Sequence, residues 1–117
     1  MVRVTCRHSE KAYAITALGH AGYSSQGNDI VCAGVSAIIY ALLGFLNNAP
    51  DKEKNLRAHA ESGKTCIFWS GKSVEVEAAF QMAVIGLLQI SSVYPEHIQV
   101  DYAADNNLNI RDFYPVQ

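Results

Sequence analysis

The chain has 117 residues and a formal net charge of −2, with 50% hydrophobic and 17% charged residues. This length suits a single domain, 1–117, with one hydrophobic core, and the composition excludes a disordered chain. A net negative charge disfavours direct binding to nucleic acid through its phosphates. The three cysteines form no C-x-x-C pair and no signal peptide is recognisable before them, so we expect reduced thiols and a cytoplasmic protein.

The first half of the chain predicts a β-hairpin followed by a helix. Residues 2–6 alternate between apolar and polar, and 13–18 form a second apolar run after a polar turn. The next apolar segment, 30–47, has the length of a helix, and the sequence from Asn47 to Pro50 ends it. The second strand therefore leads into the loop that precedes this helix.

The second half repeats the pattern of hairpin and helix and adds one strand. The expected elements are a hairpin of 56–61 and 65–70, a helix of 74–94 and a strand of 98–102. Residues 103–117 are polar and rich in Asn, and we expect a loosely held tail there. The order ββαββαβ predicts an α/β protein of the α+β type, a two-layer sandwich with two helices on one face of a mainly antiparallel sheet.

Small residues recur along one face of each predicted helix. They are Gly34, Ala37, Ala41 and Gly44 in the first helix, and Ala79, Ala83 and Gly86 in the second. Matching stripes predict that the two helices pack closely against each other. Both segments are short for a membrane span and contain polar residues, so we expect buried helices and no membrane contact. Part of this apolar surface can also serve as a dimer interface.

The glycine-rich loop between the first hairpin and the first helix carries residues typical of a catalytic site. This loop, 19–29, contains His20, and Asn28 or Asp29 at its end can cap the helix, which places Cys32 in the first turn. Unpaired N–H groups and the helix dipole stabilise an anion at that place, which favours a thiolate. The imidazole of a histidine titrates near neutral pH and can act as the base.

Each of these residues also has a structural explanation. Cys32 can be a core thiol, as we expect for the other two cysteines, because free cysteine is often buried. Asp29 can cap the helix or orient His20 as the third member of a triad, and capping is favoured because it needs no loop movement. Ser36, one turn after Cys32, can hydrogen-bond in the site or to the carbonyl of Cys32.

Other kinds of site are disfavoured. A cysteine phosphatase needs an arginine after its nucleophile, but 33–39 contains no cation. The sequences Gly63-Lys64-Thr65 and Gly71-Lys72-Ser73 resemble the end of a P-loop but lack its leading glycine. Cys6 and His8 have no second ligand pair at a spacing that suits zinc. We therefore expect no metal and no cofactor.

The loop and the helix start also share a longer motif. Its residues are Gly19-His20-Ala21, then Gly27, then Asp29-Ile30-Val31-Cys32-Ala33, then Val35 and Ser36. This combination resembles the signature of the ribosomal-processing cysteine proteases, the Prp family, and the chain length and element order fit that family too. The resemblance implies that Cys32 is the nucleophile and His20 its base. It also implies supporting positions at Gly19, Asp29 and Ser36.

The resemblance implies a substrate as well, the N-terminal extension of large-subunit ribosomal protein twenty-seven, and a homodimer. We expect Ala21, Gly22, Tyr23 and Gly27 to form a movable loop that clamps the substrate. Backbone N–H groups near the start of the first helix are expected to stabilise the oxyanion. Two alternatives stay open: a non-catalytic ribosome-assembly or peptide-binding module with Cys32 in the core, and a thiol-dependent hydrolase of another acyl substrate.

Overall fold

Five strands and two helices follow one another in the predicted order ββαββαβ. The computed structural model describes residues 1–25, 27–49, 55–71 and 73–104. The elements are β1 (Val2–His8), β2 (Ala12–Leu18), α1 (Ile30–Asn48), β3 (Arg57–Glu61), β4 (Lys64–Ser70), α2 (Val74–Val93) and β5 (Ile98–Ala104). The tail predicted from residue 103 is wrong for 103 and 104, which belong to β5, and its remainder, 105–117, lies outside the described residues.

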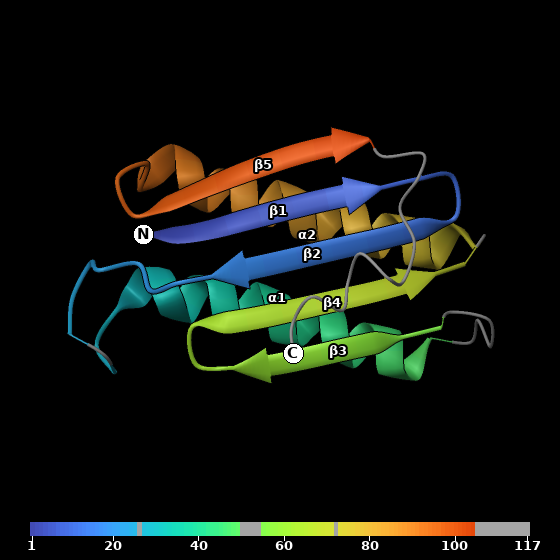
Figure 1. The fold of residues 1–117 in the computed structure, drawn as a ribbon, viewed down its shortest axis with the longest axis horizontal. Coiled ribbons are helices and arrows are strands. Elements are labelled where there is room, and N and C mark those ends of the chain that lie inside the picture. The colour runs from blue at the N-terminus through green and yellow to red at the C-terminus, as the bar shows by residue number, and fades with distance from the viewer. Residues whose placement is uncertain (26, 50–54, 72, 105–117) are drawn as a thin grey trace.

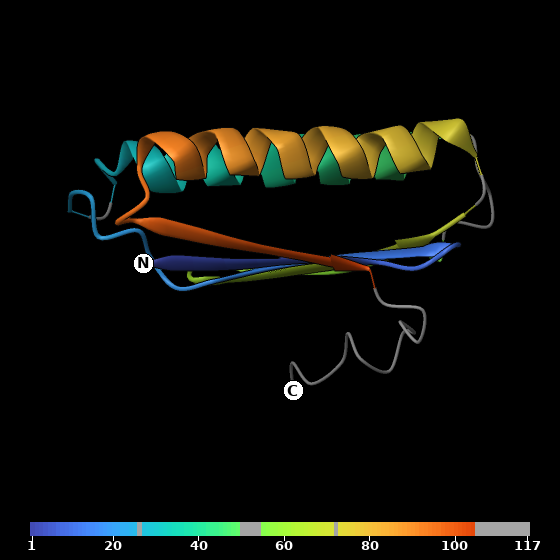
Figure 2. The same cartoon turned by 90° about the horizontal axis from the view of Figure 1, so that it is seen from above.

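The strands form one sheet in the order β3-β4-β2-β1-β5 (Figure 1). Neighbouring strands run antiparallel, except that β5 runs parallel to β1 at one edge. Both helices lie side by side on the same face of this sheet (Figure 2). The predicted two-layer α+β sandwich with a mainly antiparallel sheet is therefore confirmed.

The core lies between the sheet and the helices, because alternate strand residues point to that face. Its largest fully buried side chains include Trp69, Ile15, Leu46, Ile67 and Leu87. The indole of Trp69 stacks on Tyr13 with ring centroids 5.4 Å apart, and its N–H donates to the carbonyl of Val76 at 3.4 Å. This hydrogen bond ties β4 to the first turn of α2. A smaller cluster on the opposite face of the sheet consists of Ala12, Ala14, Cys66 and Phe68.

The two helices contact each other through pairs of isoleucine and glycine. A Cβ atom added to Gly86 would lie 2.9 Å from Cδ1 of Ile38, and one added to Gly34 would lie 3.3 Å from Cδ1 of Ile90. The predicted close packing of the two helices is therefore confirmed, with Gly34 and Gly86 in the contact, but the rest of the first small-residue stripe takes no part in it. The other members of the first stripe, Ala37, Ala41 and Gly44, are exposed. The neighbouring face of α1 carries larger side chains and packs against the sheet. These side chains are Val31, Val35, Ile39, Leu42 and Leu46.

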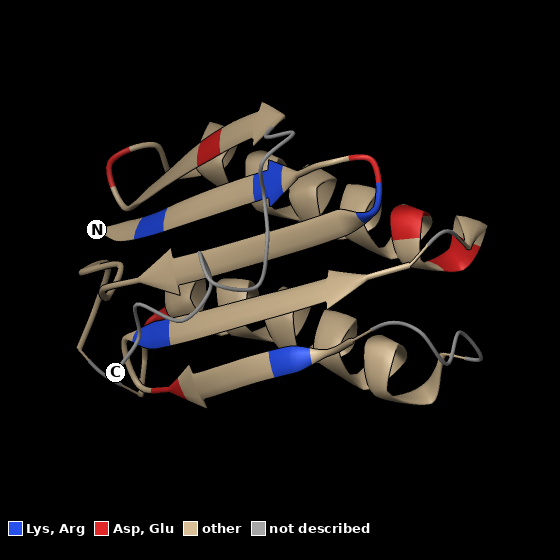
Figure 3. Cartoon of the chain, turned by 45° about the vertical axis from the view of Figure 1, so that its right-hand side comes forward, with Lys and Arg blue, Asp and Glu red and all other residues tan. Residues whose placement is uncertain are grey.

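The outward side of the helical layer is apolar and nearly uncharged. By length and composition both helices could cross a membrane, and each of them packs its buried residues towards the sheet. The helix α1 has no charged residue and α2 has only Glu75 and Glu77, in its first turn. The other described charged residues lie on strands, turns and loops (Figure 3). The outer helical surface consists of the exposed side chains Phe45, Met82, Ile85, Leu88 and Val93.

Candidate active site

Asp29 caps α1 and thereby sets the position of Cys32. Its Oδ1 accepts the N–H groups of Val31 at 2.9 Å and Cys32 at 3.0 Å, while its carbonyl oxygen accepts the N–H of Ala33 at 3.0 Å. The predicted capping role is confirmed, and Cys32 lies in the first turn of the helix. However, these three N–H groups already have acceptors. They are therefore not available to an oxyanion, and the expectation that N–H groups at the helix start stabilise it is wrong for these three.

The second carboxylate oxygen of Asp29 holds the preceding loop. Oδ2 accepts the N–H groups of Tyr23 at 2.9 Å and Ser24 at 3.3 Å. Burial by itself raises the pKa of this carboxyl, but the four backbone hydrogen bonds outweigh it and lower the pKa below its ordinary value. Asp29 is thus a carboxylate at neutral pH. Among the described residues it makes no hydrogen bond to His20, so the geometry is that of a cap rather than of a triad.

The chain has three free cysteines, and Cys32 is half-buried whereas the other two are buried. Sγ of Cys32 accepts a hydrogen bond from the N–H of Ala21 at 3.2 Å, and Ala21 itself is only 2% exposed. The other two thiols lie in the core as predicted, with burial raising the pKa of Cys6 to about 12 and, as its main cause, raising that of Cys66. Cys32 is therefore the thiol that a reagent or a substrate can reach.

His20 is exposed and rests on the turn between β3 and β4. A Cβ atom on Gly63 would lie only 2.9 Å from Nε2 of His20, so the ring occupies the space that the glycine leaves. The N–H of Gly19 donates to the carbonyl of Gly63 at 2.8 Å, which fixes the start of the loop on the same turn. Within the part of the chain that the structure describes, no hydrogen bond joins His20 to Cys32.

Gly19 has a backbone that a larger residue could not adopt here. Its φ is +93°, and an added Cβ atom would lie 2.6 Å from the carbonyl oxygen of Met1. Gly22 and Gly27 also have positive φ, but both face open space. Gly19 is thus required for packing as well as for conformation, because its backbone lies directly against Met1, the residue before β1.

A cavity of about 500 Å³ brings most of the predicted site residues together, between the loop, the start of α1 and the β3–β4 turn. The predicted residues that line it are Gly19, His20, Gly22, Gly27, Asp29, Cys32 and Ser36. The hydroxyl of Ser36 makes no hydrogen bond to any residue within the described ranges, so the proposed bond to the carbonyl of Cys32 is not formed. Ala21 and Tyr23 do not line the cavity. Tyr23 points elsewhere and packs against Tyr94 and His97.

Sequence reasoning missed two parts of the site. One is the β3–β4 turn, where Glu61, Gly63 and Lys64 line the cavity. The other is His97, whose Nδ1 lies 3.0 Å from the carbonyl oxygen of Ala21. A turn glycine was a weak signal for the first, whereas a contact across 76 positions of sequence gives no local signal at all. In the described residues, no group of three or more His, Cys, Asp or Glu side chains is placed to hold a metal ion.

Comparisons with known proteins agree with this geometry. The family model for the cysteine protease Prp matches residues 1–99. A ribosomal processing cysteine protease Prp from Staphylococcus aureus is 28% identical over 108 residues, covering 86% of this chain and 96% of the relative. The corresponding protein of Mycoplasma genitalium is 29% identical over 87 residues, covering 74% of this chain and 85% of the relative.

Solved structures share the fold. The crystal structure of Prp from S. aureus with a covalently linked product peptide has a TM-score of 0.77 at 24% identity, covering 88% of this chain and 100% of that one. The protein SMU.848 from Streptococcus mutans has a TM-score of 0.67 at 21% identity, covering 90% and 96% of the two chains. The family model spans most of the chain, including the loop and the helix start that form the cavity. The chain therefore belongs to the Prp family of cysteine proteases.

Proposed function

We propose that this protein removes the N-terminal extension of large-subunit ribosomal protein twenty-seven in the cytoplasm, as a step of bacterial ribosome maturation. Relatives named ribosomal processing proteases support this substrate class. The observation that carries the proposal is that Cys32, in the first turn of α1, lines the same cavity as His20. A non-catalytic peptide-binding module loses support, because the chain belongs to a protease family.

The chemistry assigned to the two residues is acyl transfer through a thioester. His20 takes the proton of the Cys32 thiol, and Sγ attacks the scissile carbonyl carbon. When the tetrahedral intermediate collapses, the C–N bond breaks and His20 gives its proton to the leaving amine. Water then attacks the thioester, His20 accepts a proton from it, and the acid product leaves as the thiol is restored. These steps need no metal or cofactor.

The hydrogen-bond donors of this reaction are assigned to the loop rather than to α1. Asp29 engages the N–H groups of Val31 and Cys32, so these groups serve the cap. The N–H of Ala21 donates to Sγ, and a donor at this place stabilises the thiolate before attack. Loop donors also suit a site that is completed when an extended peptide binds.

Substrate binding has one further task, which is to bring the base to the nucleophile. In the free chain the ring of His20 rests on Gly63 and is not hydrogen-bonded to Cys32. We infer that a peptide in the cavity turns the side chain of His20 from Gly63 towards Sγ, while the loop backbone keeps its contacts at Ala21. Catalytic hydrogen bonds that are open in a free enzyme commonly close in its substrate complex.

The test is cleavage of the natural precursor. Purified wild type, Cys32→Ala and Cys66→Ala are incubated with the organism's own precursor of ribosomal protein twenty-seven, and the products are weighed by mass spectrometry. Cys66→Ala is the matched control, because this thiol is 3% exposed and lies on the other face of the sheet. We expect a single N-terminal cut by wild type and Cys66→Ala, and none by Cys32→Ala.

Two results would contradict the proposal in different ways. Cleavage by Cys32→Ala would remove the nucleophile from the mechanism. No cleavage by folded wild type, with the extension present in the precursor, would remove the substrate and favour a thiol-dependent hydrolase of another acyl compound.

We also propose that the protein is a homodimer that joins through its helices. The outer helical surface is uncharged, and its side chains Met82 and Ile85 are 78% and 57% exposed. Burial of such apolar surface is a main source of free energy in obligate dimers. Sedimentation of wild type, Ile85→Asp and the control Gln99→Glu, at an exposed residue of β5, tests this. A dimer is expected for wild type and the control, and a monomer for Ile85→Asp, while a monomeric wild type would disprove the proposal.

A further inference from the structure

Ala21, the loop residue that contacts the nucleophile, is held from its other side by a histidine at the opposite end of the sequence. Its N–H donates to Sγ of Cys32 at 3.2 Å, and its carbonyl oxygen lies 3.0 Å from Nδ1 of His97. A carbonyl oxygen can only accept, so this geometry assigns the proton to Nδ1. Because Ala21 is 2% exposed, water has little access to compete for either bond.

His97 is itself fixed in place by the backbone around it. It lies directly before β5, and its N–H donates to the carbonyl of Tyr94 at 2.9 Å. Its own carbonyl accepts the N–H of Val2, the first residue of β1, also at 2.9 Å. The imidazole therefore extends from a rigid junction between α2 and the sheet, and it is half-buried. A group held in this way can fix the position of a loop.

Aromatic contacts reinforce the same attachment. The ring of Tyr23 meets His97 edge-on, with centroids 5.3 Å apart and planes at 79°. It meets Tyr94 in the same manner, at 5.4 Å and 84°. Edge-to-face pairs at such distances are favourable beyond the area they bury. The loop thus attaches to the α2–β5 junction on both sides of Gly22.

We propose that His97 is a positioning residue of this protease, which holds Ala21 so that its N–H stabilises the thiolate of Cys32. The proposal rests on the proposed function only in taking Cys32 as the nucleophile. Without the hydrogen bond to His97, the carbonyl group of Ala21 can rotate. Because the backbone of Ala21 then changes its orientation, its N–H no longer points at Sγ. A hydrogen bond to an anionic acceptor is stronger than one to a neutral acceptor. Loss of the bond from Ala21 therefore destabilises the thiolate of Cys32 more than its thiol.

Other groups around the thiol do not change in the test. The ionisable side chains that share its cavity come from the loop, from α1 and from the β3–β4 turn; they are His20, Asp29, Tyr40, Glu61 and Lys64. None of them is altered by substitution at position 97. A change in the pH profile of thiol alkylation then reports on the N–H of Ala21.

Three substitutions separate the hydrogen bond from the ring. His97→Phe keeps an aromatic ring for Tyr23 but has no donor, whereas His97→Asn keeps an N–H donor near the place of Nδ1 but has no ring. His97→Ala removes both. Glu96→Ala is the control for disturbance of the same junction, because Glu96 is exposed. Circular dichroism and thermal unfolding establish that each variant is folded.

The measurement is the rate of Cys32 alkylation by iodoacetamide from pH 5 to pH 10, read by peptide mass spectrometry. In His97→Ala and His97→Phe, we expect the profile to move to higher pH by about half to one unit, with roughly three- to tenfold slower alkylation at pH 7. His97→Asn should restore most of the wild-type profile, and Glu96→Ala should match it. Where the precursor is cleaved, kcat should fall with little change in KM.

The proposal is overturned if folded His97→Ala and His97→Phe keep the wild-type profile, or if His97→Asn behaves like His97→Phe. If His97→Ala does not fold, the comparison of His97→Phe with His97→Asn gives the same decision. Alkylation needs no substrate, so this result stands apart from the cleavage experiment. A wild type that cleaves no precursor would remove the proposed substrate and leave the role of His97 to be decided by the alkylation profiles.

Discussion

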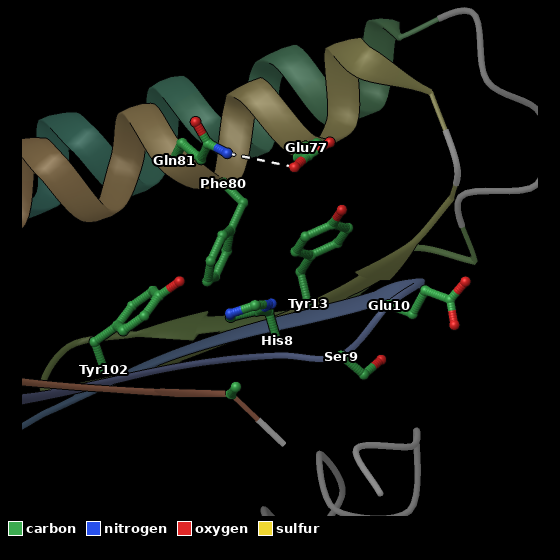
Figure 4. A pocket seen from close by; sticks show the side chains of 9 residues that line it. His8, Ser9, Glu10, Tyr13, Glu77, Phe80, Gln81 and Tyr102 are labelled. Carbon is green, nitrogen blue, oxygen red and sulfur yellow. Dashed lines mark hydrogen bonds between the residues drawn. The ribbon is translucent and has the colours of Figure 1, made fainter. Parts of the chain in front are cut away.

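Each end of the strands in this protein has a cavity, and the two cavities are built differently. Near the start of β1, a cavity of about 500 Å³ is walled by the loop, the first turns of α1 and the β3–β4 turn. At the far end of the same strand, a cavity of about 370 Å³ is lined by His8, Tyr13, Phe80 and Tyr102 together with Glu77 (Figure 4). The first contains a thiol, whereas the second contains none.

Side chains at the far end hold one another. The ring of Phe80 lies 5.0 Å from Tyr13 and 5.6 Å from His8, measured between centroids, and His8 lies 5.4 Å from Tyr102. Burial, and next the charge of Glu77, raise the pKa of Tyr13. These rings join β1, β2, β5 and α2, so their contacts contribute to the stability of the sandwich.

Side chains at the Cys32 end are held by the backbone instead. Asp29 accepts four backbone N–H groups, Cys32 accepts one, and His20 lies over a glycine. Such an arrangement leaves the reactive groups open to a substrate while fixing the places from which they extend. The comparison predicts that substitutions at the Cys32 end change chemistry, and that those at the far end change stability.

The largest difference is expected in thiol reactivity. In native protein at pH 7.5, iodoacetamide should label Cys32 at least about 100-fold faster than Cys6 or Cys66, because only accessible thiolates react. Burial raises the pKa of Cys6 to about 12, and this residue is 0% exposed. Peptide mass spectrometry over time gives the three rates. Labelling in urea should make them similar, and equally fast native labelling of Cys66 would break the comparison.

The second-largest effect, on the rate of cleavage, is expected from a change in the β3–β4 turn on which His20 rests. Gly63→Ala puts a Cβ atom 2.9 Å from Nε2 of His20 at a residue whose φ is +77°, so the ring must move. We expect kcat/KM for precursor cleavage to fall roughly tenfold or more, because the displaced imidazole no longer starts from the place from which peptide binding brings it to Sγ of Cys32. Steady-state kinetics of the folded variant measures this.

Its control is Gly71→Ala, at the far end of the molecule, where φ is also positive at 152°. Both variants should lose stability through backbone strain. Only Gly63→Ala should lose activity when rates are compared per folded molecule. Equal activity of the two would show that the place of His20 over Gly63 is unimportant for catalysis.

A smaller effect is expected when Asp29 is replaced by Asn. The amide oxygen can still cap α1, but its NH₂ group cannot accept the N–H groups of Tyr23 and Ser24. The loop should loosen while the helix start stays formed, so we expect alkylation of Cys32 to slow by about three- to fivefold. Asp29→Ala, which also removes the cap, should be less stable than Asp29→Asn. If Cys32 of Asp29→Asn is alkylated at the wild-type rate, the hydrogen bonds between Asp29 and the loop have no effect on the thiol.

The same carboxylate gives a pH dependence of stability. The fold lowers the pKa of Asp29 below its ordinary value of 3.8, so its charged form stabilises the native state. This contribution is fully present above about pH 5 and is lost as the pH falls through the lowered pKa. Thermal unfolding between pH 2 and pH 7 should therefore show a smaller acid-induced loss for Asp29→Asn than for wild type. Parallel curves for the two proteins would contradict this.

Local sequence signals predicted the elements of the fold and half of the candidate site. Alternation identified the strands, and the spacing of Asp29 and Cys32 identified a cap with a thiol in the first helical turn, because both features depend on neighbours in sequence. The parallel pairing of β5 with β1 had no such signal. The orientation of α1 about its own axis had no local signal either. Which face of the helix meets the sheet depends on all the side chains that pack there.

The other half of the site depends on contacts that sequence spacing does not reveal. His97 reaches Ala21 across 76 positions, and Gly63 comes to lie under His20 only because β4 pairs with β2. Tyr23 looked like a substrate contact because it lies beside the glycines of the loop. Its actual partners, Tyr94 and His97, follow α2, which begins only at Val74.

The smallest effect is expected at the far cavity, for Tyr102→Ala. This ring is 53% exposed and lies 5.4 Å from His8 and 6.1 Å from Phe80. Loss of these contacts should lower the free energy of unfolding by about 0.5–1 kcal/mol, because half of the ring is already in water. Urea unfolding measures the change.

Alkylation of Cys32 should be unchanged in the same variant, because the ring and the thiol lie at opposite ends of the sheet and share no partner among the described residues. Phe80→Leu, at a side chain only 2% exposed, should cost more stability, about 1–2 kcal/mol, with the same unchanged alkylation. A slower reaction of Cys32 in either variant would mean that the aromatic end acts on the thiol through the sheet, and the division between a stabilising end and a reactive end would then be wrong.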